Sequence, residues 1–237
     1  MLKTVEKTGV AALERAISIL GAFTPQDRGL TLAQLAERTG LYKSTILRLA
    51  VSLERFGYLV RRADGRFVLG RSLFRLGQIY QRSFNLVDFI EPVLQRLSRE
   101  TGFSASFWIF EGAYRVCLTR TKFSTGRRDL SGNVGERCRL DQGGSASAIY
   151  HAFTGDKGAR YDKVRRDRIA VSLGEFIPEL AAISGPVFER DKLVGTLSLG
   201  GFRSQFTRQV VAELGPRIIT AAEDLSAALA AGGTGER

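Results

Sequence analysis

The stretch GLTLAQLAERTGLYKSTILR, residues 29–48, predicts two short helices joined by a tight turn. Thr31 belongs to the residue types that cap helix N-termini. Gly40 is expected to end the first of the two helices, because glycine tolerates the left-handed conformation of a sharp turn. Two apolar rows at helical spacing mark the inner faces of these helices: Leu32, Leu35 and Ala36, then Ile46, Leu49, Ala50 and Leu53.

The neighbouring residues complete a three-helix unit that is followed by a hairpin. Upstream, an earlier helix is indicated by the row Leu13, Ala16, Ile17 and Leu20. Downstream, residues 58–62 and 66–69 are β-prone and flank Ala63-Asp64-Gly65. Asp-Gly favours a hairpin because both residues accept positive φ. Three helices and a hairpin in this order predict a winged helix-turn-helix.

The polar face of the third helix suits the major groove of DNA. On a helical wheel Ser44, Arg48 and Arg55 lie opposite the apolar row, and Thr45 lies on one flank. Lys43 is at the N-terminal end, where free backbone N–H groups favour phosphate. Such a helix presents its first side chains to base edges, and Arg48 is the best candidate to contact guanine. The expected DNA contacts are Thr31, Lys43, Ser44, Thr45, Arg48, Arg61, Arg62 and Arg66.

The charge balance favours a polyanionic partner. The 237 residues carry 35 Lys and Arg against 24 Asp and Glu, a net charge of +11. The first 70 residues hold eleven of these bases and six of the acids, so they are the more basic part per residue. Charge alone leaves nucleic acid and an anionic membrane surface open. A polar helix face with two arginines is by itself typical of a solvated helix, and it is the combination with the hairpin that favours DNA.

Composition narrows the class of protein. A hydrophobic fraction of 44% and a charged fraction of 25% are ordinary for a globular chain, which argues against disorder and against a disulfide scaffold. No apolar run is long enough to span a bilayer, and residues 1–9 lack the apolar segment of a signal peptide. Only two cysteines are present, Cys117 and Cys138, so a reducing cytoplasmic setting is expected. Because no apolar run spans a bilayer, no membrane partner is expected.

Few residues are available for catalysis or for metal binding. His151 is the only histidine, and Gly143-Gly-Ser-Ala-Ser147 lacks the closing glycine of a nucleophile elbow. The cysteines do not form a C-x-x-C pair, so a zinc site is not expected. We therefore expect no enzyme, no metal and no cofactor. A nucleic-acid architectural protein without any ligand stays open as an alternative, since it would show the same salt dependence without a response to a metabolite.

Beyond residue 70 helices precede strands. A helix is expected over residues 71–82. In the next helix Asp88 and Glu91 suggest a capping box, which would place Pro92 in the first turn, where no intrahelical N–H is needed. Its core face is expected to be Ile90, Val93, Leu94 and Leu97. The basic run from Arg115 to Arg139 is interpreted as a solvated loop.

Strands alternate with helices in the remaining chain. The expected strands are 104–110, 114–121, 183–189 and 193–199, and a helix follows Gly143-Gly144-Ser145. The last helix, around residues 211–229, is expected to be kinked or interrupted at Gly215-Pro216. The basic segment 160–168 is expected to be surface.

In these motifs the chain resembles the IclR family of bacterial transcriptional regulators. Residues 29–48 are similar to its helix-turn-helix signature, and residues 53–58 and 65–70 are similar to its wing and exit. The likeness continues more loosely through Gly135, the Gly143-Gly144 segment, residues 185–188 and residues 194–200. Departures are Tyr42 in place of the family's usual proline, and Ala146-Ser147-Ala148 where Gly-Lys-Ala is frequent.

The resemblance implies an α+β protein with four parts. These are a winged helix-turn-helix over 1–70, a linker helix over 71–84, a GAF-like α/β effector-binding domain over 85–230 and a flexible tail over 231–237. It also implies a homodimer or homotetramer on double-stranded operator DNA. The implied function is that of a transcriptional regulator that responds to a small organic effector.

The resemblance also implies where that effector binds. Gly144, Ser145 and Ser198 match pocket positions of the family, and a Gly-Gly-Ser turn before a helix exposes N–H groups suited to a carboxylate. Arg139 could add charge-assisted bonds, and Trp108 could form the wall for an aromatic ligand. We therefore expect a carboxylate or an aromatic acid at Trp108, Arg139, Gly144, Ser145 and Ser198. The bland interpretation of these residues is a helix cap and core packing.

Overall fold

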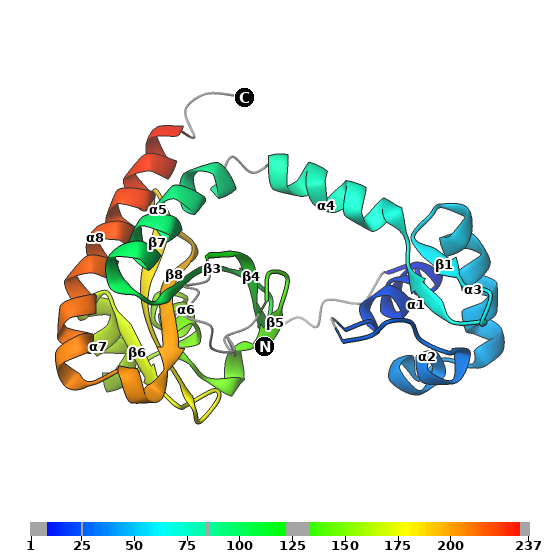
Figure 1. Ribbon diagram of the computed structural model, residues 1–237, viewed down its shortest axis with the longest axis horizontal. Coiled ribbons are helices and arrows are strands. Elements are labelled where there is room, and N and C mark those ends of the chain that lie inside the picture. The colour runs from blue at the N-terminus through cyan, green and yellow to red at the C-terminus, as the bar shows by residue number, and fades with distance from the viewer. Residues whose placement is uncertain (1–8, 25, 84–85, 122–132, 233–237) are drawn as a thin grey trace, which may run out of the picture. The chain divides into compact units, whose positions relative to one another are not determined.

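A computed structural model of the protein describes residues 9–24, 26–83, 86–121 and 133–232 (Figure 1). The chain forms two compact units that divide between residues 83 and 84. The expected tail over 231–237 lies almost entirely outside the described residues, and so does the part of the basic run between residues 122 and 132.

The N-terminal unit is a winged helix-turn-helix. Its elements in order are α1 (Ala11–Gly21), α2 (Leu32–Thr39), α3 (Lys43–Arg55), β1 (Leu59–Arg61) and β2 (Phe67–Leu69). All three helices and the hairpin contribute to one small core, whose buried members are Ile19, Leu30, Leu35, Ile46, Ala50, Leu53, Leu59 and Phe67. The α2 and α3 faces expected from the apolar rows are the faces that point into this core.

The inner face of α1 agrees with the expected one at Ala16 and Leu20 and differs from it at Leu13 and Ile17. Ile19 is fully buried, whereas Leu13 and Ile17 remain 59% and 57% exposed. Helix α1 carries two apolar stripes, and the stripe through Ala16 and Ile19 packs into the core with α3 while the stripe through Leu13 and Ile17 faces outward. Periodicity shows that both stripes are apolar, but only the tertiary packing decides which of them is buried.

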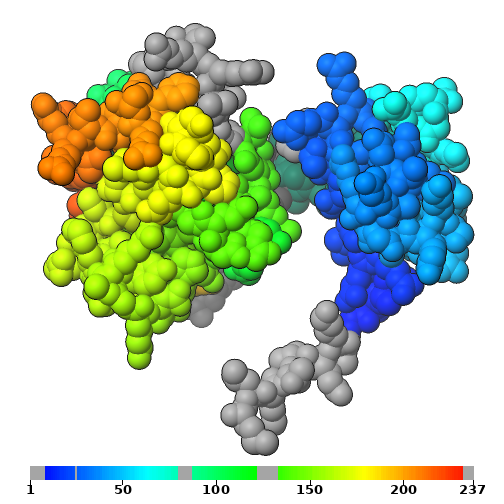
Figure 2. Space-filling view, turned by 90° about the horizontal axis from the view of Figure 1, so that it is seen from below, coloured from blue at the N-terminus to red at the C-terminus, as the bar shows by residue number. Residues whose placement is uncertain are grey.

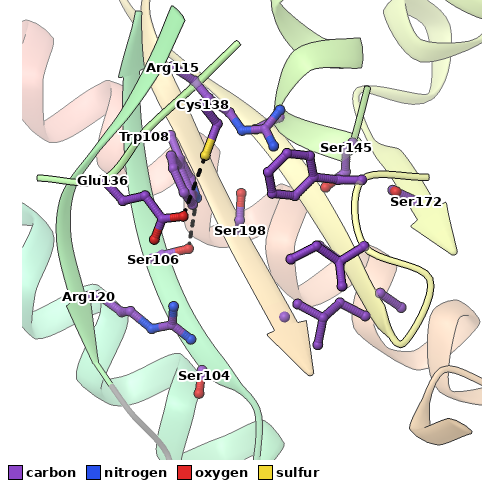
Figure 3. A pocket seen from close by; sticks show the side chains of 18 residues that line it. Ser104, Ser106, Trp108, Arg115, Arg120, Glu136, Cys138, Ser145, Ser172 and Ser198 are labelled. Atoms are coloured by element: carbon purple, nitrogen blue, oxygen red, sulfur yellow. Dashed lines mark hydrogen bonds between the residues drawn. The ribbon is translucent and has the colours of Figure 1, made fainter. Parts of the chain in front are cut away.

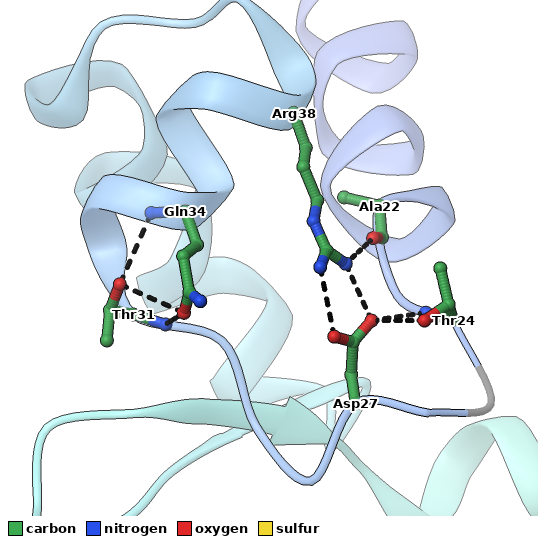
Figure 4. A network of polar contacts seen from close by, with 6 residues as sticks. All are labelled: Ala22, Thr24, Asp27, Thr31, Gln34 and Arg38. Atoms are coloured by element: carbon green, nitrogen blue, oxygen red, sulfur yellow. Dashed lines mark hydrogen bonds and ion pairs between the residues drawn. The ribbon is translucent and has the colours of Figure 1, made fainter.

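Two polar clusters fix the ends of α2 (Figure 4). Thr31 forms a complete capping box with Gln34: the Gln34 N–H donates to the Thr31 hydroxyl, and the Thr31 N–H donates to the Gln34 side chain. At the other end Gly40 adopts φ 68°, as expected for a left-handed C-cap. Arg38 donates to both carboxylate oxygens of Asp27, at 2.6 and 3.0 Å, which ties the last turn of α2 to the preceding loop.

The wing is a hairpin that closes on the expected loop, Ala63-Asp64-Gly65. The Arg62 N–H donates to the Arg66 carbonyl at 2.8 Å across the base of this loop, and only Gly65 in it has a positive φ. The expectation that Asp64 also adopts positive φ is wrong. Its side chain instead accepts a hydrogen bond from the Arg66 N–H, which stabilises the turn without a left-handed residue.

Helix α4 (Arg71–Ser83) begins directly after the wing. At its start the chain passes so close to the end of α3 that a Cβ on Gly70 would lie 2.1 Å from the Gly57 carbonyl oxygen. Only glycine fits at this position. The Ser72 hydroxyl then donates to the Phe56 carbonyl at 2.7 Å, which ties the first turn of α4 to the N-terminal unit.

The C-terminal unit is a six-stranded antiparallel sheet with helices on both faces (Figure 1). The sheet order is β5-β4-β3-β8-β7-β6, with β3 (Ser104–Glu111), β4 (Tyr114–Thr121), β5 (Arg137–Arg139), β6 (Ala170–Leu173), β7 (Leu180–Glu189) and β8 (Lys192–Phe202). Helices α5 (Leu86–Thr101) and α8 (Arg208–Gly232) pack on one face, and α6 (Ser145–Phe153) and α7 (Ala159–Asp167) belong to the other. This is the mixed α/β domain of the expected fold class.

The two faces of the sheet differ in chemistry because its residues alternate. Apolar side chains such as Phe107, Ile183 and Leu197 point toward α5 and α8 and form the main core. Between them in the sequence stand serines, including Ser106, Ser184 and Ser198, which are buried on the opposite face. The sheet therefore offers α6 a hydroxyl-lined surface.

The expected first-turn position of Pro92 is wrong, and so is the expected interruption of the last helix at Pro216. Helix α5 begins at Leu86, so Asp88 lies inside its first turn as an acidic residue and Pro92 lies in the second turn. Helix α8 continues through Pro216 without interruption. In both cases the carbonyl left without a donor belongs to a residue that is not buried, Asp88 or Ala212, where water can bond it.

Several short elements were not expected from the sequence: β5, α7, β6 and the 3-10 helices η1 (Leu140–Gln142) and η2 (Arg203–Gln205). Each is nine residues or fewer, and α7 and β5 are rich in arginine, so their apolar periodicity is weak. In the described part of the chain no helix has the length and apolar character needed to cross a membrane.

Candidate functional site

The exposed face of α3 gathers the polar residues expected to contact DNA. Lys43, Ser44 and Arg48 are exposed, and Thr45 is half-buried on the flank. Tyr42 precedes the helix without a side-chain cap from any described residue, so the first N–H groups of α3 are open. Such an N-terminus carries partial positive charge and favours an anion. Figure 2 shows the surface that α2 and α3 contribute to one face of the N-terminal unit (blue).

The wing adds three exposed arginines. Arg61 lies with its guanidinium carbon 5.4 Å from the centre of the Phe67 ring, and Arg66 pairs weakly with Asp64 at 3.7 Å. Within the described residues, Lys43, Arg48, Arg61 and Arg62 have no ion pair with a carboxylate. Their charge is therefore available to a polyanion rather than neutralised by the protein itself.

Thr31 differs from the other expected DNA contacts. Its hydroxyl is half-buried and belongs to the capping box with Gln34. The residue lies at the N-terminus of α2, the helix that crosses the DNA backbone in helix-turn-helix proteins. Its first role is to hold α2 in place.

The C-terminal unit contains a cavity of about 100 Å³ between the serine face of the sheet and the start of α6 (Figure 3). Serine hydroxyls and two arginines line one side. The segment that follows β6 lines the other side with apolar groups, among them Phe176, Ile177 and Leu180. The cavity thus combines an apolar wall with a small number of convergent polar groups, which is the general character of small-molecule sites.

A β-bulge brings both arginines, Arg115 and Arg120, to the same cavity. Phe107 pairs with Thr119 whereas Trp108 pairs with Cys117, so Leu118 is an extra residue in β4. In a regular strand two residues five apart face opposite sides. The extra residue restores them to one side, and Figure 3 shows Arg115 and Arg120 on the strand that borders the cavity.

Arg115 is the most unusual residue of this cavity, and it is only 4% exposed. Its Nη1 donates to the Gly143 carbonyl at 2.6 Å and to the Ser147 hydroxyl. Its guanidinium carbon lies 4.7 Å from the centre of the Phe176 ring and 5.5 Å from that of Trp108. Burial lowers the pKa of Arg115 below its ordinary value, yet a guanidinium stays charged in proteins. The interpretation of residues 115–139 as a solvated loop is therefore wrong for Arg115.

A chain of three serine hydroxyls lies across the cavity floor. Ser145 is 2.7 Å from Ser184, and Ser184 is 2.6 Å from Ser198, measured between hydroxyl oxygens. All three residues are at least 96% buried. Two hydrogen bonds use two of the three protons, so one proton at an end of the chain can be donated into the cavity.

Four of the five residues expected to bind the effector line the cavity: Trp108, Gly144, Ser145 and Ser198. Arg139 does not. It lies on edge strand β5 with 56% of its side chain exposed, and it pairs with Asp141 at 2.5 Å. Near these residues a carboxylate of the protein, that of Glu175, accepts from the Gly144 N–H at 3.4 Å and from Arg160 at 2.7 Å.

Sequence reasoning missed Arg115, Ser106 and Phe176. A signal existed for the first two: Arg115 is a single cation inside the apolar strand sequence Tyr-Arg-Val-Cys-Leu, and Ser106 alternates with apolar residues. Phe176 lies in an irregular segment and gave no such signal.

The cysteines lie near the cavity but do not have the properties of reactive thiols. Cys138 lines the cavity, and Cys117 lies on β4 beside it. Burial raises the pKa of Cys117 to about 12 and also raises that of Cys138, so both thiols stay protonated at neutral pH. Among the described residues no group of His, Cys, Asp and Glu could hold a metal ion.

Known proteins resemble this chain in both units. Residues 12–63 match the family model of the IclR helix-turn-helix domain. The HTH-type transcriptional regulator KipR of Bacillus subtilis is 24% identical, with 90% of this chain and 94% of that protein covered. An IclR transcriptional regulator from Silicibacter has a similar fold with a TM-score of 0.80, at 19% identity, covering 92% of this chain and 96% of that chain.

A further solved structure carries a ligand. An IclR homologue from Microbacterium hydrocarbonoxydans, in complex with 4-hydroxybenzoate, has a TM-score of 0.76 at 18% identity, with 93% of this chain and all of that chain covered. At this identity the likeness shows the fold alone.

A winged helix-turn-helix followed by a separate α/β domain defines the class of two-part DNA-binding regulators. Residues 12–63 form an IclR helix-turn-helix domain, and over nearly its whole length the chain is similar to a transcriptional regulator. The chain is a DNA-binding transcriptional regulator. The relatives that it matches are transcriptional regulators rather than enzymes.

Proposed function

We propose that this regulator binds operator DNA through α3 and the wing, and that a small organic acid in the cavity of the C-terminal unit changes its affinity for that DNA. The DNA half is supported by four exposed cations without carboxylate partners in the described residues, Lys43, Arg48, Arg61 and Arg62. The ligand half is supported by one observation above the others, the buried charge of Arg115 at a cavity.

Each expected contact has a role in this proposal. Arg48 contacts a base, preferably guanine, from the centre of α3. Lys43, Ser44 and Thr45 contact phosphates and neighbouring bases at the open N-terminus of α3, and Thr31 contacts the backbone from the start of α2. Wing residues Arg61, Arg62 and Arg66 contact the backbone or the adjacent minor groove. Two or four copies of the chain bind a symmetric operator in the cytoplasm, since half-sites of DNA mirror the symmetry of an oligomer.

Substitution of Arg48 tests the DNA half. On a duplex selected in vitro from a random library, Arg48→Ala should weaken binding about 5- to 150-fold and relax the preference at one base pair. Arg208→Ala, an exposed arginine of the C-terminal unit, is the matched control and should leave binding unchanged. Equal binding by Arg48→Ala and the parent would reject α3 as the base-contacting element.

A thermal-shift screen tests the ligand half. Carboxylates and aromatic acids that prefer the folded state raise the melting temperature. A compound that does so should also change operator affinity by a factor of about 5 to 150, the usual range of coupling between two sites. An operator affinity that no compound alters would instead favour an architectural DNA-binding protein without an effector.

A further inference from the structure

The cavity contains a permanent positive charge, that of Arg115, which forms no ion pair with a carboxylate of the described part of the chain. Arg115 is 96% buried, and none of the described carboxylates lies within ion-pair distance of its guanidinium. Its neighbours include a carbonyl, a hydroxyl and two aromatic rings. A buried charge is costly unless it is paired, so an anion that enters this cavity gains more here than at any exposed arginine.

The guanidinium is held in one orientation before any ligand binds. Both hydrogens of Nη1 are used, by Gly143 and by Ser147, and the rings of Phe176 and Trp108 lie against the group. The Nε–H and the Nη2 hydrogens lie along one edge of the planar group, and the thiol beside it, that of Cys138, is neutral and only a weak acceptor. This edge presents two parallel donors, which matches the two oxygens of a carboxylate.

The sequence suggests two other binding positions for a carboxylate, Gly144 and Arg139, and both are less suitable than Arg115. The Gly144 N–H at the start of α6 already donates to the protein's own carboxylate, Glu175. Arg139 is exposed and pairs with Asp141. Arg115 differs from both, because its charge is buried and no carboxylate of the described chain occupies its fork.

The surroundings limit the anion further. Arg115 and Arg120 line the cavity together with one carboxylate, that of Glu136, so these three side chains leave a net charge of one positive unit for the ligand. A volume of about 100 Å³ admits only a small compound, and Ile177, Leu180 and Ala182 offer an apolar wall for a short tail. The chemistry favours a monoanion with one carboxylate over a phosphate or a dicarboxylate.

We propose that Arg115 determines the charge specificity of the cavity and seats the carboxylate of a small monoanionic acid, with the apolar tail of the acid against Ile177 and Leu180. This inference rests on the proposed ligand function, and it names the residue and the ligand charge for that site.

Trp108 makes the proposal measurable before the natural ligand is identified. It is the only tryptophan of the chain and it lines the cavity, so its fluorescence reports on occupancy. The probes are acetate, propionate and benzoate, each compared with its neutral amide of nearly the same shape. At least one carboxylate should bind about tenfold or more tightly than its amide, because hydrogen bonds to a charged group are the stronger ones. Inorganic phosphate should not compete.

Variants then assign the preference to one residue. Arg115→Met, which removes the charge at similar length, should abolish the difference between carboxylate and amide. Arg115→Lys keeps the charge without the fork and should retain only part of it. Arg139→Gln tests the rival seat, and Arg96→Gln is an exposed control. Fluorescence spectra and melting curves of the variants without probe establish that they are folded.

Two results would overturn the proposal. One is that no carboxylate binds in the cavity beside Trp108 more tightly than its amide. The other is that the preference survives in folded Arg115→Met or disappears in Arg139→Gln. Failure of the proposed function has a different signature: carboxylates bind through Arg115, yet none of them alters operator affinity.

Discussion

The arginines of the two units carry the same charge under opposite conditions. On α3 and the wing, Arg48, Arg61 and Arg62 are exposed to water and salt, and they are positioned by the helix and hairpin that carry them. In the C-terminal unit Arg115 is enclosed by a sheet, a helix and two rings. Exposed cations favour binding of a polyanion because there are many of them and because they attract it over a long range. An enclosed cation favours binding of one anion because its position and orientation are fixed in a medium of low dielectric constant. The contrast suits a regulator that, as we propose, binds DNA with one unit and a small anion with the other.

The largest expected difference between the two units is the salt dependence of their binding. If about four cations contact phosphates, the slope of log affinity against log salt is about −3.6, and a fourfold rise in salt weakens DNA binding about 150-fold. Carboxylate binding at Arg115, measured by Trp108 fluorescence, should change less than about threefold over the same range, because buried pairs are screened less. Arg61→Gln and Arg62→Gln should each reduce the DNA slope by about 1. Equal salt dependence of both kinds of binding would contradict the enclosed character of the cavity.

The cores of the two units should respond independently to substitution. Ile46 is fully buried in the N-terminal unit, and Ile46→Ala should lower its free energy of unfolding by about 2–5 kcal/mol. Circular dichroism in urea follows the helices of both units, whereas Trp108 fluorescence follows only the C-terminal one. The variant should therefore shift the dichroism transition and leave the fluorescence transition in place.

The neighbouring Leu47 provides the matched control for this experiment. It is 37% exposed, so Leu47→Ala should cost less than about 1 kcal/mol. A fluorescence transition that moved together with the dichroism in Ile46→Ala would show that the two units unfold as one.

The sequence predicted best the features that depend on residues close together in the chain. The capping residue Thr31, the left-handed Gly40 and the inner faces of α2 and α3 follow from spacing and residue type, and the structure has them as expected. The inner face of α1 followed only at Ala16 and Leu20. Leu13 and Ile19 are both strongly apolar, and it is packing against α3 that buries Ile19 and leaves Leu13 exposed.

The cavity was less accessible to sequence reasoning. Alternation indicates strands 104–111 and 114–121, but it does not indicate the bulge at Leu118 that brings Arg115 and Arg120 to one side. The pairing of β4 with β5 and the approach of Phe176 join residues up to 61 positions apart. Arg115 looked like one cation in a basic run because its burial is a property of the assembled sheet. The role proposed for it, like the roles of the DNA-contacting residues, stays a prediction.

The cap of α2 gives a smaller effect than the core. Thr31→Ala removes the side-chain oxygen that accepts from the Gln34 N–H, and the expected loss of stability is about 1 kcal/mol. Thr31→Ser retains the hydroxyl and should restore most of it. The measurement is again the dichroism transition in urea. If Thr31→Ala were as stable as the parent, the capping box would make no contribution to stability.

The ion pair of Asp27 and Arg38 should give the smallest effect, and it should depend on pH. The Asp27 carboxylate accepts hydrogen bonds from Arg38 and from the N–H and hydroxyl of Thr24, and these bonds hold its pKa well below the ordinary value of 3.8. A carboxyl group whose pKa is depressed by folding stabilises the fold above its unfolded pKa, and this contribution is lost as the pH falls below about 4. Since Arg38 is 36% exposed, solvent screens the pair and keeps the contribution small.

Asp27→Asn isolates this contribution. The parent should exceed the variant in stability at pH 7, and the difference should shrink as the pH is lowered from 5 to 3, because the unfolded parent then binds a proton at Asp27 that the folded parent does not bind, whereas the variant has no such group. The dichroism transition at each pH measures the difference, and Asp64→Asn, an exposed carboxyl group on the wing, is the control. A difference that stayed constant down to pH 3 would mean that the substitution disturbs packing rather than charge. In that case packing rather than the ion pair would position the loop before α2, as the aromatic rings position Arg115. The contrast between exposed and enclosed charges would then not apply to Asp27 and Arg38.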